Sequence, residues 1–136
     1  MKTKIIIATI LLLLTLGVVS ATMDDFQTPS GWELINNGIY KGPTINEGLV
    51  VSDYTQLDVE EYLTPSSTLK INKQPDNTII FDDTKNNEHG VAEVVTVDGD
   101  KYIIMFWATS DGMSDEELMN VMLEFNSLNH VKPIPV

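Results

Sequence analysis

The sequence predicts an α+β fold: an antiparallel sheet with a long C-terminal helix and a short middle helix packed on it. Three observations carry this prediction. Two β-rich segments meet at Asp98-Gly99, a dipeptide that strongly favours a hairpin. A capped amphipathic segment follows at 114–128, and several short β-rich segments separated by turn residues precede the hairpin. Grouped strands followed by a helix are typical of an antiparallel sheet covered by helices.

The first 21 residues have the pattern of an export signal. Two lysines precede an almost uninterrupted apolar run at 5–19, and a small-residue site allows cleavage after Ala21. An apolar run of about 15 residues is short for a membrane span, which needs about 20. We therefore expect residues 1–21 to be a cleaved signal peptide, and the alternative is an uncleaved N-terminal transmembrane anchor. Under either interpretation, residues 22–136 form one α+β domain that is extracytoplasmic, either secreted or membrane-anchored.

Charge and composition exclude several classes of partner. The chain is acidic, with a formal net charge of −12, and it contains no arginine and no cysteine. Two of the eight lysines precede residue 22, which leaves six lysines against 20 acidic residues in the rest of the chain. Such a field repels nucleic acid and anionic lipid, and bidentate phosphate recognition by arginine is absent. We expect no nucleic-acid partner, membrane contact only through the N-terminal segment, and a core held by packing without disulfides.

The first part of the domain predicts short strands joined by tight turns. Residues 26–34 predict a short edge strand, a Pro-Ser-Gly turn and an aromatic residue that docks on the core. Asn37-Gly38 favours a two-residue hairpin with a return strand at 39–41. A further short strand is expected at 48–52.

The middle of the chain predicts the short helix and a second group of strands. Asp58 is placed to cap a helix at 59–63, which Pro65 ends. After a polar loop, an irregular strand is expected around 69–72 and a compact strand at 78–81.

The hairpin at Asp98-Gly99 is the strongest local signal. A charged turn at 82–90 leads into its first strand at 91–97. One face of the second strand carries Tyr102, Ile104, Phe106 and Ala108, and the other carries Lys101, Ile103, Met105 and Trp107. Because both faces are largely apolar, we expect this strand to be central and at least partly covered on both sides.

The C-terminal helix is predicted from its cap and its apolar stripe. Ser114 and Glu117 have the spacing of a capping box, in which each side chain accepts from the backbone N–H of the other residue. The predicted core stripe is Leu118, Val121, Met122, Phe125 and Leu128, widened by Met119 and Leu123. Asn129 is the expected residue just past the helix, and Pro133 prevents its continuation.

The order of these elements resembles that of PsbP/Mog1/DcrB-like domains, and especially small secreted methanogen proteins of unknown function with this layout. The resemblance covers 26–128 and rests on Phe26, Pro29, Gly31 and Trp32, on the turn Gly99-Asp100-Lys101-Tyr102, and on the helix 117–127. It implies an N-terminal β-meander, a short helix, a long hairpin and a C-terminal helix. It also implies an extracytoplasmic location and an accessory or binding role, with no catalytic residue to transfer.

The densest group of potential ligands lies before and after the predicted strand at 91–97. Its members are Asp82, Asp83, Glu88 and His89 on one side, with Asp98 and Asp100 on the other. Carboxylates on adjacent loops suit Ca²⁺, which takes six to eight oxygen ligands. The intervening strand alone would separate the two loops by about 20 Å, so our main interpretation is solvated acidic turns. A weak Ca²⁺ site is the alternative, and we assign no metal ligand and no cofactor.

Catalytic signatures are equally sparse. A second acidic group, Asp111, Asp115, Glu116 and Glu117, is explained by the positive end of the helix dipole. His89 and His130 have no ligand-spaced partner, and we expect each to be a lone solvent-facing side chain. No serine sits in a Gly-x-Ser-x-Gly elbow, the candidates being Ser52, Ser66, Ser67 and Ser110. The enzyme hypothesis is a hydrolase that uses Asp82 and Glu88 as acid and base.

The function predicted from these observations is a binding or interaction module at the cell surface, monomeric and without enzymatic activity. Its expected partner is a protein or an envelope component. Among the aromatic residues, Trp107 is predicted to lie in the core, because it falls on an apolar strand face. Trp32 stands beside a turn and is the one aromatic residue for which a binding role stays open.

Overall fold

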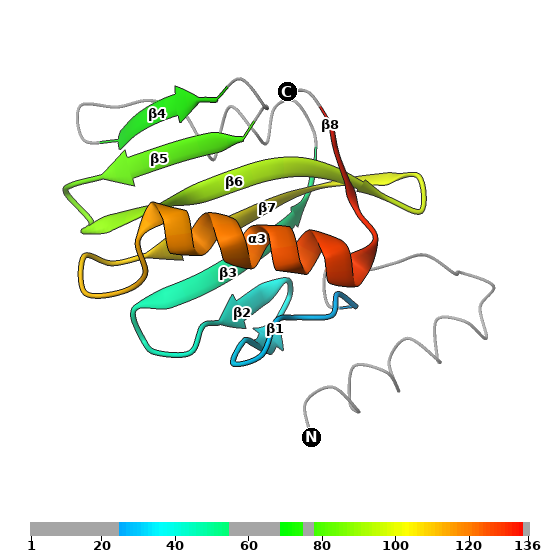
Figure 1. Cartoon of the computed structure of the whole chain (residues 1–136), viewed down its shortest axis with the longest axis horizontal. Helices are drawn as coiled ribbons and strands as arrows, with labels where there is room; N and C mark the ends of the chain where they lie inside the picture. The colour runs from blue at the N-terminus through cyan, green and yellow to red at the C-terminus, as the bar shows by residue number, and fades with distance from the viewer. Residues whose placement is uncertain (1–24, 55–68, 75–77, 135–136) are drawn as a thin grey trace.

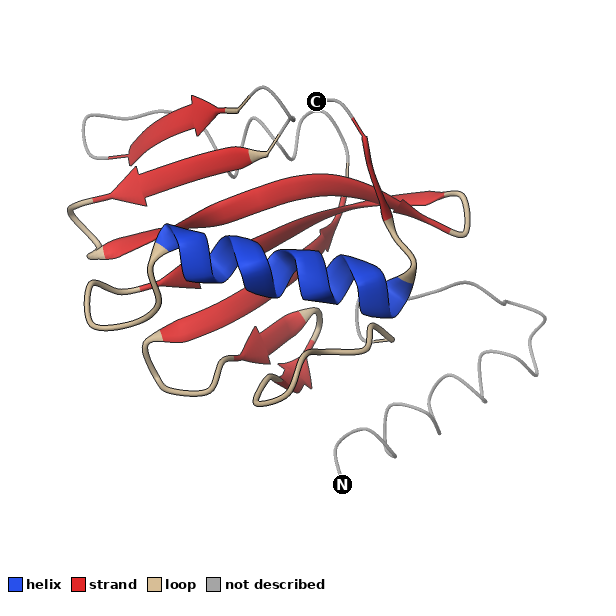
Figure 2. Cartoon of the chain, in the orientation of Figure 1, coloured by secondary structure: helices blue, strands red, loops and turns tan. Residues whose placement is uncertain are grey.

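The computed structural model describes residues 25–54, 69–74 and 78–134. This described part is an eight-stranded antiparallel sheet with one helix lying across one face (Figure 1, Figure 2). The elements are β1 (Glu33–Asn36), β2 (Ile39–Lys41), β3 (Glu47–Asp53), β4 (Leu69–Lys73), β5 (Ile79–Asp83), β6 (Glu88–Val97), β7 (Asp100–Ala108), α3 (Asp115–Asn129) and β8 (Lys132–Ile134). The predicted antiparallel sheet with a C-terminal helix is confirmed, whereas the helix predicted at 59–63 and the segment 1–21 lie outside the described residues.

The sheet consists of two meanders that meet where β3 pairs with β7. Its strand order is β1-β2-β3-β7-β6-β5-β4. β8 pairs with Val94–Thr96 of β6, beyond the part of β6 that pairs with β5. The sequence pattern does not predict β8, because three residues that include a proline show no periodicity. Within the described ranges, no helix is both long and apolar enough to cross a membrane.

Both predicted two-residue hairpins are confirmed by their backbone angles. The φ angles are 52° at Asp98 and 85° at Gly99, and 49° at Asn37 and 78° at Gly38. Two consecutive positive φ values are the requirement of a type I′ turn, which Asn or Asp followed by Gly meets at low steric cost. The turns therefore set the register in which β7 returns along β6 and β2 returns along β1.

The start of α3 is as predicted, and its end is displaced by one residue. Ser114 Oγ accepts from the Glu117 N–H at 3.2 Å, and Glu117 Oε1 accepts from the Ser114 N–H at 3.1 Å. The left-handed residue at the end is His130, with φ 52°, rather than Asn129. Asn129 stays helical because its side-chain amide donates to the carbonyl oxygen of Phe125 at 2.8 Å and to that of Gln27 at 2.8 Å.

The buried stripe of α3 is narrower than predicted and includes a polar residue. Its buried members are Leu118, Met122, Phe125 and Asn126. Leu123 is 58% exposed and Leu128 is 37% exposed, so the prediction that they lie in the core was wrong. The sheet covers less than half of a single helix, and residues at the margin of the apolar stripe therefore stay in water.

The core between α3 and the sheet is built around aromatic residues. Phe26 stands edge-on to Tyr102 at 5.3 Å, and Trp32 stands edge-on to Phe106 at 5.2 Å. The predicted edge strand at 26–34 is present only from Glu33 onward, and the residues before it are coil and turn. This coil is anchored by its aromatic side chains, which bury their area without a hydrogen-bond ladder.

The opposite face of the sheet carries a second, smaller apolar cluster. Its buried members are Ile79, Ala92 and Ile103, with Ile71 and Met105 packed against them. β7 is thus central and at least partly covered on both faces, as predicted. The β5–β6 ladder is longer than predicted, since Asp83 pairs with Glu88, and the turn between these strands is only the four residues 84–87. The irregular strand predicted at 69–72 is the regular strand β4.

Candidate functional site

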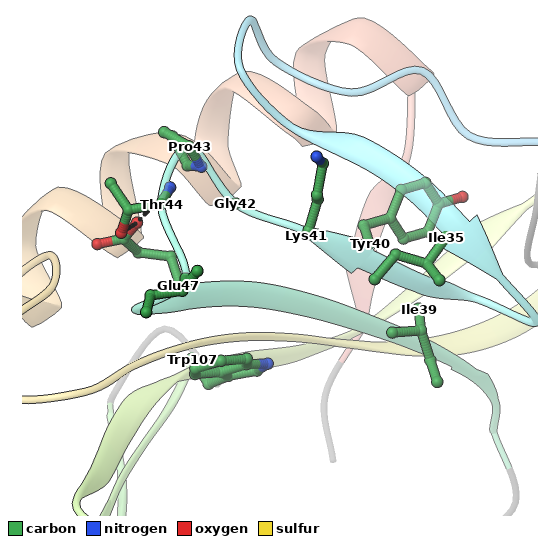
Figure 3. A pocket seen from close by; sticks show the side chains of 10 residues that line it. Ile35, Ile39, Tyr40, Lys41, Gly42, Pro43, Thr44, Glu47 and Trp107 are labelled. Atoms are coloured by element: carbon green, nitrogen blue, oxygen red, sulfur yellow. Dashed lines mark hydrogen bonds between the residues drawn. The ribbon is translucent and has the colours of Figure 1, made fainter. Parts of the chain in front are cut away.

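An apolar hollow of about 310 Å³ opens where β1, β2, β3 and β7 adjoin (Figure 3). Its apolar wall is made of Ile35, Ile39, Tyr40, Pro43, Ile45 and Trp107, and Lys41, Thr44 and Glu47 add polar groups. We call it the Trp107 groove. Figure 3 shows Trp107 and Ile39 on the same side of β2 and β3. Trp107 alternates along β7 with the residues that face α3, so its indole lies on the face away from the helix.

The position of Trp107 depends on the glycine paired with it. A Cβ atom at Gly48 would lie 2.5 Å from three atoms of the indole, so the ring occupies the space above the β3 backbone. On the other side of Trp107, Gly90 is equally restricted, since a Cβ atom there would lie 2.1 Å from the Phe106 carbonyl oxygen. Glycine inside a strand often marks such a close approach. Trp107 was predicted to lie in the core, but its side chain is only half-buried and borders the groove.

Glu47 fixes the loop that forms one end of the groove. Its carboxylate is buried, and Oε1 accepts from the Thr44 hydroxyl at 2.7 Å and from the Thr44 N–H at 3.1 Å. Oε2 accepts from the Met113 N–H at 3.1 Å, which ties the loop before β3 to the loop before α3. A buried carboxylate is stable when several donors surround it. This rigid loop holds Ile45, which is 94% exposed, beside the groove.

The exposed isoleucines of this region form a group. Ile35 and Ile39 are 43% and 44% exposed, and together with Ile45 they border a single hollow. Scattered exposed apolar residues are normal, but a contiguous apolar surface beside a hollow marks a binding surface. The one charge pair at its side, Lys41 with Glu33 at 3.4 Å, is solvent-exposed and contributes little stability.

A second hollow of about 370 Å³ lies at the β5–β6 turn. We call it the acidic hollow, and it is lined by Asp82, Asp83, Thr84, Asn87, Glu88, His89, Ser110 and Asp115. It joins two acidic groups that lie far apart in the sequence. His89 Nδ1 lies 2.6 Å from Asp115 Oδ1, so the expectation that His89 is a lone solvent-facing side chain was wrong. The contact connects the start of β6 to the first turn of α3, a pairing that no sequence spacing indicates.

The register of the strands separates the predicted acidic residues. Asp82 pairs with His89 and Asp83 pairs with Glu88, so Asp82 and Glu88 project from opposite faces of the β5–β6 ladder. Asp98 and Asp100 lie at the other end of β6, as expected from the length of the intervening strand. In the part of the chain that the structure describes, no three His, Asp or Glu side chains are grouped so that they could hold a metal ion.

Trp32, for which a binding role stayed open, is a core residue. It is only 6% exposed, and its ring stands at 83° to that of Phe106. The structure thus reverses the two tryptophans, since Trp107 is half-buried and borders a hollow, whereas Trp32 is buried in the core. The signal that could have indicated this is Gly48, because a glycine inside a strand predicts that a large neighbour lies over it.

The two hollows lie at the same end of the sheet. Glu47 pairs with Ala108, and Ala108 pairs with His89, so the loop before β3, the loop after β7 and the β5–β6 turn are adjacent. No protein-family model, curated protein or solved structure matches this chain. The function must therefore be inferred from this geometry.

Proposed function

We propose that the protein is an extracytoplasmic binding module at the cell surface and that the Trp107 groove is its binding surface. The observation that carries the proposal is the grouping of three exposed isoleucines around one hollow beside a half-buried tryptophan. Covering apolar surface contributes about 25 cal/mol per Å². A partner that places an apolar side chain in the groove gains this free energy, and most binding sites have this form.

The rigidity of the groove supports the proposal. Its base is a β-sheet in which Trp107 lies against Gly48, and its end is the loop that Glu47 holds with three hydrogen bonds. A preformed surface loses little conformational entropy when a partner binds. The groove is therefore suited to binding without a conformational change.

The cellular part of the proposal is supported by the sequence. Residues 1–21 have the pattern of an export signal, and the PsbP/Mog1/DcrB-like motifs imply an accessory or binding role. The partner in this proposal is a protein or another envelope component, bound by a monomer. Nucleic acid is a poor partner because the chain is acidic and has no arginine.

The hydrolase hypothesis has less support. An acid and base pair must flank one scissile bond, and Asp82 and Glu88 project from opposite faces of their ladder. The Ca²⁺ alternative is also weaker, because the carboxylates are divided between the two ends of β6. Neither hypothesis accounts for the exposed isoleucines.

The first prediction compares one charge placed inside the groove with one placed outside it. Ile39→Asp should abolish binding of a capped leucine peptide, because burying the new carboxylate is costly. Leu123→Asp on α3 is the matched control, since Leu123 is also an exposed large hydrophobic residue. Binding is measured by isoleucine methyl NMR shifts, and thermal melts check that both variants fold. Equal binding by the two variants would exclude the groove.

A further inference from the structure

We propose that the segment bound in the Trp107 groove is basic: its apolar side chain enters the groove, and a lysine or arginine of the same segment lies at the acidic hollow. The inference rests on the proposed function and names the chemistry of the partner. The proposed occupant is an extended segment of another protein. Three observations lead to it, namely the charge of the surface, the spacing of the two hollows and the state of the carboxylates near each.

The first observation is the charge that any partner meets. From residue 22 onward, six lysines stand against 20 acidic residues, so the surface as a whole attracts cations and repels anions. An acidic partner would approach the groove against this field. Electrostatic complementarity therefore selects a basic segment to carry the apolar side chain.

The second observation is the distance between the hollows. Gly48 pairs with Trp107, and Trp107 pairs with Gly90 of β6, so the groove is two strand spacings from β6. Strands lie about 4.8 Å apart, which places the β5–β6 turn about 10–15 Å from the groove. An extended chain rises about 3.3 Å per residue and spans this distance with about three to five residues.

The third observation concerns which carboxylates are accessible to a cation. Glu47 at the groove is buried and already accepts hydrogen bonds from Thr44 and Met113, so it is a poor site for a lysine. Asp82 and Glu88 at the acidic hollow are exposed. Asp115 at the acidic hollow already contacts His89. Lys85 in the β5–β6 turn is exposed, but it is not among the residues that line the hollow.

The arrangement of the acidic hollow suits an organic cation better than a metal ion. Its carboxylates come from both faces of the β5–β6 ladder and from α3, and among the described residues they form no metal-binding group of three. An ammonium or guanidinium group on a flexible stem needs no fixed coordination geometry. The hollow therefore contributes selectivity for charge, while the groove contributes the apolar contact.

In the test, the full chain carries labelled isoleucine methyl groups and labelled backbone amides. It is titrated with unstructured peptides that contain one leucine and one lysine. The two residues are separated by about three to five residues. Comparison peptides replace the lysine with glutamine or place it directly beside the leucine. We expect the groove methyl groups and the His89 amide to shift with one midpoint. We expect the glutamine and adjacent-lysine peptides to bind about fivefold more weakly, the scale of an exposed ion pair.

Two double variants locate the charge effect. Asp82→Asn/Glu88→Gln removes two charges at the acidic hollow, and Asp98→Asn/Asp100→Asn removes two at the far end of β6. We expect the first to lose the lysine preference and the second to keep it. If both behave alike, or if the glutamine peptide binds as well as the lysine peptide, the basic partner is wrong and the groove stands. If no leucine peptide shifts the isoleucine methyl groups, the proposed function itself is wrong.

Discussion

At the scale of single residues, the groove depends on a position that has no side chain. Gly48 lets the indole of Trp107 lie against the β3 backbone, with a Cβ position only 2.5 Å from the ring. The same contact explains why Trp107 is half-buried although it lies on an apolar strand face. Its exposure is thus set by a residue on another strand, 59 positions away in the sequence.

The second prediction tests this contact through Gly48→Ala. The new methyl group must displace the indole, and overpacking of this kind typically costs about 1–3 kcal/mol in the free energy of unfolding. Chemical denaturation measures the loss, and tryptophan fluorescence should report a more exposed Trp107. The double variant Gly48→Ala/Trp107→Leu should recover most of the penalty that Gly48→Ala adds, because the smaller side chain leaves room. A purely additive double variant would contradict the contact.

At the scale of elements, α3 is held by a cap, an apolar stripe and several polar contacts, and the contact of Asn126 with Glu93 is buried. Asn126 Nδ2 donates to Glu93 Oε1 at 2.7 Å, and both residues are more than nine-tenths buried. Asn126 Oδ1 has no hydrogen-bond partner, which offsets part of this gain. The sequence pattern placed Leu123 at the margin of the buried stripe. Periodicity takes account of apolar character, but not of how much of the helix the sheet covers.

The third prediction compares these two helix residues. Asn126→Ala should lower the free energy of unfolding by about 1–2 kcal/mol, because it removes a donor from a buried carboxylate. Leu123→Ala should change it by less than about 0.5 kcal/mol, because Leu123 is mostly in water. Urea denaturation of both variants measures the difference. A larger loss for Leu123→Ala would mean that α3 lies on the sheet with a different face.

At the scale of the whole molecule, acidic residues are spread over the surface rather than gathered at one centre. The β5–β6 turn and the β6–β7 turn lie at opposite ends of β6, and α3 adds Asp115, Glu116 and Glu117 at its first turn. This distribution sets the field that a partner meets, and among the residues that the structure describes it gives a small ion no closed set of ligands.

The fourth prediction follows from this distribution. Adding Ca²⁺ to the full chain after treatment with EDTA should leave its melting temperature unchanged, since only an ion that binds the folded state selectively raises stability. Differential scanning calorimetry is the measurement, and Mg²⁺ at equal ionic strength is the control for screening. A rise of several degrees that chelation reverses would restore the Ca²⁺ hypothesis.

The sequence by itself determined the features that depend on local chemistry. The turns at Asn37-Gly38 and Asp98-Gly99 are predictable because a positive φ at two adjacent positions selects those residues. The capping box of Ser114 and Glu117 is predictable because its two hydrogen bonds join residues three positions apart. The α+β class follows from the order of these segments along the chain.

Only the tertiary structure decided the candidate site, because the contacts that create its two hollows join residues that are distant in the sequence. The pairing of β3 with β7 places Gly48 beside Trp107, and the position of α3 over β6 brings Asp115 to His89. Strand periodicity tells which residues share a face, but it does not tell which strand lies alongside or how much of that face a neighbour covers. The groove and the acidic hollow exist because of those long-range pairings.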